Sequence, residues 1–314
     1  MIDYVLQRVF DLIFDKPLPP PAPEEKESLI ELQKTCRDFQ PLETANALPS
    51  EVAWFTFMNR LRALVLSRDS RKFLRWDVIT QTMFVSSAGY ISTELNYLKK
   101  LADWAAKWRD AIKETAVGQP SLYWKYPASS GNLIHQAYHL ARFSDKTAVN
   151  VASLDYVLEF GGGYGSMCRL FFNLGFKGKY VIFDLPLFSA LQKYFLKTIG
   201  LQVCSIQAFK QAKTGVICLS DIQELNDLLS DGNELGNSMF VATWSIDEAP
   251  VAIRDSVLSQ SSRFKAFLFA YNVAFGEVDN IDFFISLQSR YKDVSWQSFK
   301  IEHLPGNNYL FGGK

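Results

Sequence analysis

A glutamate followed by a glycine-rich loop is the arrangement in this chain with the clearest chemical meaning. Residues 159–165 read Glu-Phe-Gly-Gly-Gly-Tyr-Gly and follow a short apolar run. Glycines at 161, 163 and 165 permit positive backbone angles and let the backbone approach a ligand closely. This pattern predicts a ligand-binding loop between a strand and a helix, although a merely tight turn would use the same glycines.

The carboxylate of Glu159 indicates which ligand the loop favours. Dinucleotide-binding loops follow G-x-G-x-x-G and present bare amides to a pyrophosphate, whereas here the spacing is G-x-G-x-G. A carboxylate beside the loop would repel a pyrophosphate but would attract a cation, such as the ammonium group of a methionine moiety. The loop therefore predicts a cationic cofactor.

A second acid, Asp184, lies 25 residues after Glu159 and ends the next apolar run, in Phe183-Asp184-Leu185-Pro186. An acid at the end of the second strand can accept both ribose hydroxyls of a nucleoside. The alternative role is a helix N-cap, because Pro186 suits the first turn of a helix. Asp221 is a further candidate that would either reach an adenine amine or cap the helix that follows it.

The second half of the chain alternates short apolar runs with helical segments, which is typical of a parallel sheet wrapped by helices. The expected strands are 156–160, 180–183, 215–219, 239–243 and 266–271, and the helices between them include 167–174, 187–199 and 248–258. Two further strands, 294–299 and 309–311, have no helix between them and predict an antiparallel hairpin. Residues 202–206 are an ambiguous extra strand. The predicted fold is a doubly wound α/β domain over residues 151–314.

The first half is predicted to be mostly helical. Residues 2–14 carry Val5, Val9, Leu12 and Ile13 at helical spacing, and the proline-rich stretch 17–23 follows as an extended spacer. We expect this helix to dock on the protein or on a second copy. Residues 24–150, with long helical stretches such as 51–66 and 91–112, form a helical part that would act as a lid, a substrate-binding part or a dimer contact.

Residues from about 118 to 314 resemble the class I S-adenosylmethionine-dependent methyltransferases, and more narrowly the sugar O-methyltransferase family. The resemblance rests on Leu158-Glu159-Phe160-Gly161-Gly162-Gly163-Tyr164-Gly165, on Phe183-Asp184-Leu185-Pro186, on Thr243-Trp244-Ser245-Ile246-Asp247-Glu248 and on Pro305-Gly306-Asn307-Asn308-Tyr309-Leu310. Ser130-Gly131-Asn132 resembles a further element of that family, but Leu133 stands where the family has proline. The resemblance implies a Rossmann-like, seven-stranded sheet with an inserted final hairpin, S-adenosylmethionine as cofactor and methylation of a sugar hydroxyl.

Methyl transfer to a hydroxyl needs a base for its proton, and three regions offer one. His135 and His139 lie four residues apart on one face of a predicted helix, with His139 the candidate base; both would otherwise satisfy local hydrogen bonds. A zinc-protease motif is excluded because Gln136 replaces the required glutamate. Asp247 and Glu248 follow the fourth strand and would act as base, hold a hydroxyl, bind a divalent ion or simply begin a helix. His303 lies in the hairpin connection, where surface exposure is the expected state.

The predicted site can be stated by role. The candidate catalytic residues are His139, Glu248 and Asp247; the candidate cofactor-binding residues are Glu159, Gly161, Gly162, Gly163, Gly165, Asp184, Leu185, Asp221 and Trp244; the candidate substrate-binding residues are Tyr138, His135, Ser245 and His303. No metal ion is expected. N- or C-methylation and a catalytically silent methyltransferase-like binding module are the competing functions.

Composition limits the partners that we expect. Lys plus Arg number 33 and Asp plus Glu number 33, so no net field attracts nucleic acid or anionic lipid. The four cysteines are scattered, and the first residues do not resemble a secretion signal. We therefore expect a cytoplasmic protein that acts on a small-molecule or glycan acceptor, with no nucleic-acid or membrane partner and a possible homodimer.

Overall fold

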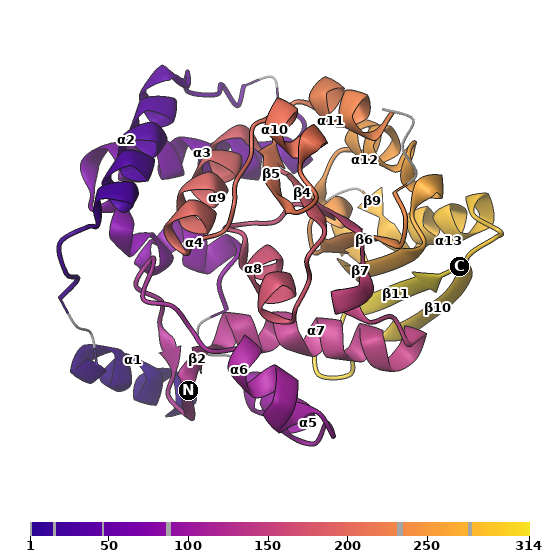
Figure 1. The fold of residues 1–314 in the computed structure, drawn as a ribbon, viewed down its shortest axis with the longest axis horizontal. Coiled ribbons are helices and arrows are strands. Elements are labelled where there is room, and N and C mark those ends of the chain that lie inside the picture. Colours follow the sequence, from indigo (N-terminus) through magenta and orange to yellow (C-terminus); the bar gives the residue numbers. More distant parts are fainter. Residues whose placement is uncertain (1, 15–16, 46, 86–88, 231–234, 276–277) are drawn as a thin grey trace.

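The computed structural model describes residues 2–14, 17–45, 47–85, 89–230, 235–275 and 278–314. Its centre is a seven-stranded sheet in the order β10-β11-β7-β6-β3-β4-β5 (Figure 1). The strands are β3 (Tyr156–Phe160), β4 (Lys179–Phe183), β5 (Gly215–Leu219), β6 (Ser238–Thr243), β7 (Ala266–Asn272), β10 (Ser295–Lys300) and β11 (Asn307–Gly313).

The winding of the sheet reverses beside β3. Strand β3 pairs in parallel with both β4 and β6, and the chain runs outward to β5 before it crosses back to β6 and β7. β11 then inserts antiparallel between β7 and β10. The predicted doubly wound sheet with a closing antiparallel hairpin is confirmed, and the reversal leaves a crevice at the carboxyl ends of β3 and β6.

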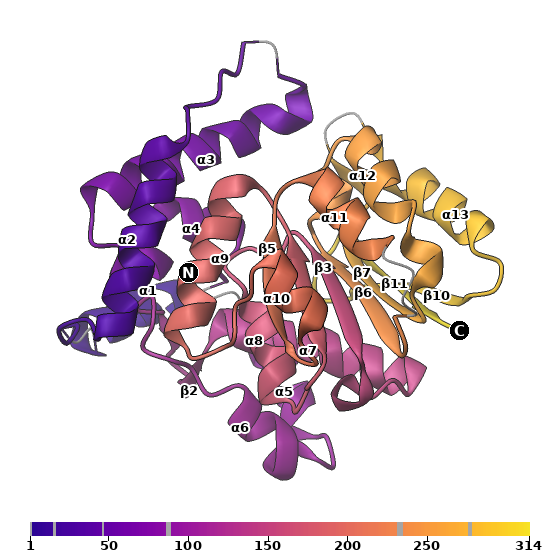
Figure 2. The ribbon, with the colours of Figure 1, turned by 45° about the horizontal axis from the view of Figure 1, so that its top comes forward.

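Helices cover both faces of the sheet, so its strands are apolar on both sides. One face packs against α7 (Gly131–Thr147), α8 (Ser166–Asn173) and α9 (Pro186–Thr198). The other packs against α10 (Ile206–Gln211), α11 (Ile222–Leu229), α12 (Val251–Leu258) and α13 (Asn280–Arg290), as Figure 2 shows. A small hairpin of β8 (Ala274–Phe275) and β9 (Val278–Asp279) precedes α13.

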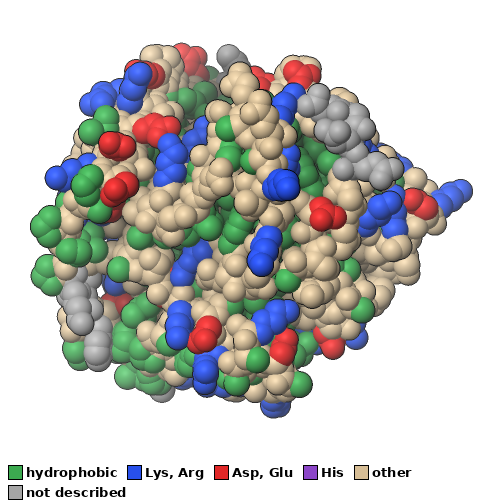
Figure 3. Space-filling view, viewed as in Figure 1, with side chains coloured by type: hydrophobic (Ala, Val, Ile, Leu, Met, Phe, Trp, Pro, Cys, Tyr) green, Lys and Arg blue, Asp and Glu red, His purple; other side chains and the backbone are tan. Residues whose placement is uncertain are grey.

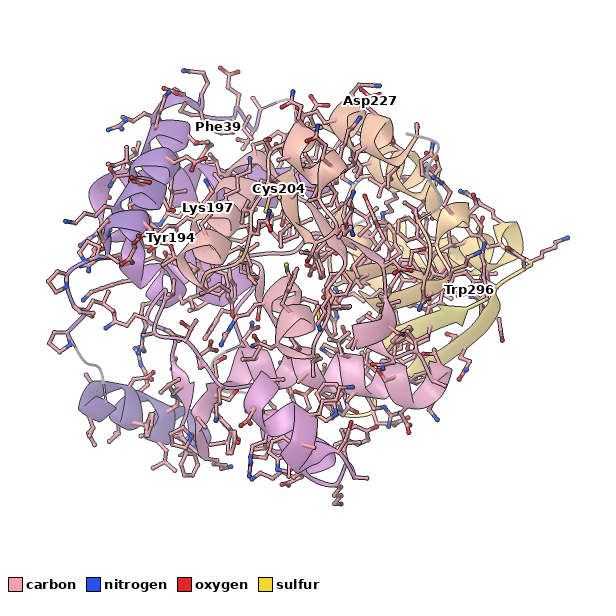
Figure 4. The ribbon with its side chains drawn as sticks, in the orientation of Figure 1. Phe39, Tyr194, Lys197, Cys204, Asp227 and Trp296 are labelled. Atoms are coloured by element: carbon pink, nitrogen blue, oxygen red, sulfur yellow. The ribbon has the colours of Figure 1, made fainter. Side chains whose placement is uncertain are left out.

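The helical first part adds to one of these faces. It consists of α2 (Pro23–Asp38), α3 (Pro49–Ser67), α4 (Asp77–Thr82), α5 (Ile91–Lys99), α6 (Arg109–Ala111) and the short strands β1 (Leu122–Tyr123) and β2 (Tyr126–Ser130). Its buried residues belong to the same core cluster as one face of the sheet. On α9, Tyr194 and Lys197 (Figure 4) bond Glu25 and Glu31 of α2 at 3.1 and 2.6 Å.

Helix α1 (Ile2–Phe14) docks through its polar side chains. Gln7 is buried and bonds Ser121 Oγ at 3.0 Å and the Leu122 carbonyl at 2.7 Å, while Asp11 accepts a hydrogen bond from Ser121. The apolar stripe of the predicted helix faces outward instead, and its exposed members are Val5, Leu6, Val9, Leu12 and Ile13. Among the described residues, no helix is both long enough and apolar enough to cross a membrane.

Three local predictions differ from the structure. The long helix expected over 91–112 ends at Lys99 and continues, after a turn, as one turn of π-helix (Trp104–Trp108) and α6. The ambiguous strand over 202–206 is a single bridge between Val203 and Val216. The helix expected from Glu248 begins only at Val251, because Pro250 forces the preceding Ala249 into an extended conformation and a separate 3₁₀ turn occupies Ile246–Glu248.

Candidate functional site

A cavity of about 620 Å³ opens at the carboxyl ends of β3, β4 and β6. The sheet contributes the glycine loop and the residues after β4 and β6, and the helical part contributes the opposite wall. The residues that line it include Trp54, Phe55, Met83, Phe84, Val85, Tyr90, His135, Glu159, Gly161, Gly162, Gly163, Asp184, Leu185, Ser220, Ile222, Trp244, Ser245, Pro250, Ile253 and Leu304. The cavity is therefore enclosed by both halves of the chain.

The glycine loop packs tightly against the turn after β6. Gly161 has φ +70°, and a Cβ added to it would lie 2.3 Å from the Cβ of Ser245. Ser245 Oγ in turn donates a hydrogen bond of 2.5 Å to the Phe160 carbonyl. Gly165, with φ +94°, is the N-cap of α8. Only glycine fits at 161, so the loop geometry explains the motif directly.

Glu159 is buried at the end of β3 without a cationic partner. It is 3% exposed and accepts a hydrogen bond of 2.9 Å from the hydroxyl of Tyr180. Burial, helped by the nearby Asp184, raises the pKa of Glu159 to about 8, although the hydrogen bond from Tyr180 opposes the shift. Among the described residues it makes no salt bridge with a lysine, arginine or histidine. A cation that entered the cavity would stabilise its ionised form.

Asp184 holds the loop from the end of β4. One oxygen accepts hydrogen bonds from the Gly163 amide at 3.0 Å and from Gln192 at 2.8 Å, and the other accepts from the Leu185 amide at 2.7 Å. Burial raises the pKa of Asp184 to about 7, although these bonds oppose the shift. The N-cap of α9 is Leu185, so the alternative role of Asp184 as that cap is wrong.

Asp221 lies outside the cavity and caps a helix. Its side chain is exposed and accepts hydrogen bonds from the amides of Gln223 at 2.7 Å and Glu224 at 3.2 Å at the start of α11. Its neighbours Ser220 and Ile222 line the cavity instead. The predicted contact of the Asp221 carboxylate with adenine is therefore corrected to the capping role.

Trp244 and His135 form the inner wall. Trp244 has a left-handed backbone, φ +52°, and its indole nitrogen donates a hydrogen bond of 2.5 Å to Asn307 Oδ1. Its ring stacks on the imidazole of His135 with centroids 5.3 Å apart and planes 19° apart. These two predicted site residues therefore lie against each other inside the cavity.

A buried carboxylate from α5 binds two of the three histidines. Glu94 is fully buried, and its oxygens lie 2.8 and 3.0 Å from His135 Nδ1 and 2.8 Å from His303 Nε2. His303 is 15% exposed and does not line the cavity, so the expected surface exposure and the substrate role are both corrected. The connection between β10 and β11 folds over α5. This position depends on tertiary packing, and the local sequence does not indicate it.

His139 and Tyr138 lie behind the cavity wall. His139 is fully buried, and its Nδ1 bonds the hydroxyl of Tyr309. Burial holds the pKa of His139 well below its usual value, and the nearby His135 and His303 lower it further. Tyr138 packs edge-on against Tyr97 and His303, each at 5.1 Å. Neither predicted residue lines the cavity, because His139 faces Tyr309 of β11 and Tyr138 faces Tyr97 of α5.

Asp247 and Glu248 also lie outside the cavity lining. Asp247 is fully buried and accepts hydrogen bonds from the amide and side chain of Asn272, at 2.8 and 3.2 Å. The buried Arg254 donates to the Asp247 carbonyl at 2.6 Å. Burial raises the pKa of Asp247 to about 6 and that of Glu248 to about 8. The structure gives Asp247 a role in holding this turn, rather than contact with a substrate.

Two residues of the site were not predicted: Glu94, and Tyr90, which lies one helical turn earlier and lines the cavity. Tyr90 packs on His135 and His303 with centroids 5.4 and 5.7 Å apart. No local signal marks either residue, since Glu94 is one acid among many on predicted helices. No group of three or more potential metal ligands is present in the ranges that the structure describes.

No protein-family model matches the chain, and no curated protein matches its sequence. Solved structures with some likeness include precorrin-6y C5,15-methyltransferase from Geobacter metallireducens GS-15, with 11% identity and a TM-score of 0.35 over 57% of this chain and 86% of that one. The CurJ carbon methyltransferase shares 12% identity and a TM-score of 0.38, over 92% of this chain and 90% of that one. Magnesium protoporphyrin IX methyltransferase from Synechocystis PCC 6803, solved with S-adenosylmethionine, shares 10% identity and a TM-score of 0.37, over 73% of this chain and 99% of that one. Likenesses this weak carry no conclusion, so function must be argued from the residues of the cavity.

Proposed function

We propose that this chain transfers the methyl group of S-adenosylmethionine to a hydroxyl of a small acceptor, a sugar or another natural product. One observation carries the proposal: two buried carboxylates, Glu159 and Asp184, flank a glycine loop at the switch point of a doubly wound sheet. Both pKa values are raised because the carboxylates are buried with too little compensating charge. The cofactor carries a positive ammonium and a ribose diol, which match these two acids.

The residues present fit this cofactor in three ways. Glu159 would bind the ammonium group, and Asp184, which already accepts three hydrogen bonds, would accept one from a ribose hydroxyl with its remaining lone pair. The loop at Gly161 to Gly163 has no side chains that would block the ligand. Ser220 and Ile222, which follow β5, line the part of the cavity where the adenine would lie. When bound, the cofactor supplies an electrophilic methyl group on a sulfonium. The protein contributes alignment and exclusion of water by closing the helical part over the cavity as a lid.

The outer lining supports an uncharged acceptor. Its side chains are mostly apolar or aromatic: Trp54, Phe55, Met83, Phe84, Val85, Tyr90, Pro250, Ile253 and Leu304. Within the described part of the chain, no lysine or arginine lines the cavity, which disfavours phosphorylated or carboxylated acceptors. This lining favours a hydroxylated natural product with an apolar ring over a bare sugar. Acidic and basic side chains are interspersed on the face in Figure 3, in keeping with a small-molecule acceptor rather than nucleic acid.

Two alternative functions differ from this proposal in the acceptor atom or in the affinity for the cofactor. An N- or C-methyltransferase would bind the same cofactor but would methylate amines or activated carbons. A silent binding module would bind the cofactor weakly or not at all. A dimer contact through the helical part is compatible with each of the three.

Calorimetric titration with S-adenosylmethionine and S-adenosylhomocysteine tests the cofactor, with NAD as the comparison ligand. We expect saturable binding of the first two and a loss of about 1.5–3 kcal/mol in Asp184→Ala, because charged hydrogen bonds are removed. Asp221→Ala is the matched control, since that exposed acid follows the neighbouring strand but lies outside the cavity lining. Binding of NAD alone, or equal losses in the two variants, would reject the proposed site.

A further inference from the structure

A fully buried carboxylate with hydrogen bonds to two histidines has an energetic consequence. Burial alone would raise the pKa of Glu94, but the charge of His135 and the hydrogen bonds from His135 and His303 hold it below its usual value. The carboxylate therefore stays ionised although α5, α7 and the hairpin connection enclose it. Such an anion fixes the ring orientation of each histidine that donates to it.

The bond to Glu94 decides which nitrogen of His135 can react. An ionised carboxylate only accepts hydrogen bonds, so His135 must carry a proton on Nδ1, and in the neutral ring Nε2 then keeps its lone pair. None of the described residues bonds Nε2, and His135 lines the cavity. The ring is clamped between Trp244 at 5.3 Å and Tyr90 at 5.4 Å.

His139 also has an Nε2 without a hydrogen-bond partner among the described residues, but it does not reach the cavity. It is fully buried, it lies outside the cavity lining, and its Nδ1 bonds the hydroxyl of Tyr309 rather than a carboxylate. A base must lie within reach of the proton that it removes. The geometry therefore favours His135 over the predicted His139.

We propose that His135, held by Glu94, is the catalytic base that takes the proton from the acceptor hydroxyl. This inference rests on the proposed methyl transfer and identifies the residue that would deprotonate the acceptor hydroxyl. The acceptor oxygen forms a bond to the methyl carbon, and the carbon–sulfur bond breaks with its electron pair going to sulfur. The hydroxyl proton moves to His135 Nε2, and the resulting imidazolium lies against the anionic Glu94 before it releases the proton to water.

His303 is a positioning residue in this scheme. It does not line the cavity, but its hydrogen bond of 2.8 Å orients the same Glu94 oxygen that bonds His135. Other titratable groups also face this cluster, so the pH profile belongs to the group as a whole. They are Tyr90, Tyr138, His139 and Tyr309.

The chain has only three histidines, so ¹⁵N-histidine labelling resolves each imidazole, with assignment by His→Gln variants. We expect the neutral His135 ring to carry its proton on Nδ1 and not on Nε2. His139 should stay neutral throughout the titration, because burial holds its pKa well below the usual value. A proton on Nε2 of His135, or an imidazolium that persists at pH 8, would overturn the proposal without any acceptor being known.

The kinetic arm uses catechol and methyl α-glucoside as acceptor probes and measures release of S-adenosylhomocysteine. For a probe that is methylated, His135→Gln should lower kcat about 10²–10⁴-fold with unchanged cofactor affinity, and the loss should shrink at high pH, where the hydroxyl ionises unaided. Glu94→Gln should shift the pH profile of kcat, and His303→Gln, which retains a donor, should lower kcat less than His303→Ala does. Wild-type kcat in His135→Gln would reject the base, whereas absence of cofactor binding to the wild-type protein would reject the proposed function itself.

Discussion

Glu159 and Asp184 are acids that the ligand-free protein buries at a cost. Their ordinary pKa values lie near 4, and burial raises them to about 8 and about 7. An acid with a raised pKa in the folded state stabilises the fold below its ordinary pKa and loses that contribution as the pH rises through the raised value. The ligand-free protein should therefore lose stability between about pH 4 and pH 8 through these two groups.

Cofactor binding should release protons at pH 7, because a bound cation favours the ionised form of Glu159. Calorimetry in two buffers of different ionisation enthalpy measures this release. In Glu159→Gln we expect a smaller release and a loss of affinity of about 1.5–3 kcal/mol, or roughly 10- to 150-fold in Kd. Glu248→Gln is the matched control, because burial also raises its pKa to about 8 but it does not line the cavity. Equal proton release in wild type and Glu159→Gln would show that Glu159 does not meet the cation.

At the scale of elements, the glycine loop depends on the turn after β6. Gly161→Ala should destabilise the protein through its left-handed φ, by about 1–2 kcal/mol, and further through the collision with Ser245. Gly200→Ala separates the two effects, since Gly200 has φ +85° with no atom within 4 Å of an added Cβ. Urea unfolding of the two variants measures the difference. The double variant Gly161→Ala, Ser245→Gly should recover the part due to collision, and no recovery would place the strain elsewhere.

Most of the fold follows from the sequence because the strands are buried on both faces and the connecting helices have clear boundaries. Each of the seven predicted strands is present, several of them within one residue of the expected ends. Prediction failed where tertiary packing decides the outcome. The stripe containing Val9 and Leu12 looks like a docking face, yet α1 binds through Gln7 and Asp11.

The site was predictable to the extent that it is local in sequence. Glu159 and the glycine loop lie at the end of β3, and Asp184 follows the end of β4. Trp244 follows the end of β6, which pairs with β3 on its other side. The Glu94 cluster joins residues 41 and 209 positions apart, and no spacing rule links them. The sequence pattern therefore indicated the histidine pair but not that His135, rather than His139, lines the cavity.

At the scale of the whole molecule, the helical part and the sheet share one core cluster, so they should unfold together. We expect coincident urea transitions by far-UV circular dichroism and by tryptophan fluorescence. A saturating ligand at 100 times its Kd should shift the whole transition by about 2.7 kcal/mol. The chain 118–314 alone should lack a cooperative transition, because it exposes the apolar surfaces of α7 and α9 that the helical part covers. Two separate transitions in the full chain would contradict a shared core.

The position of Trp244 gives the molecule an optical property. Its indole stacks on His135 and meets the edge of His139 at 5.0 Å. A protonated imidazole in contact with an indole quenches its fluorescence by accepting an electron from the excited ring, whereas a neutral imidazole quenches much less. The chain has seven tryptophans, so the test needs a variant that retains only Trp244. Emission from that variant should dim when His135 gains a proton, and under the proposed mechanism a stopped-flow fluorimeter would follow this proton through each turnover.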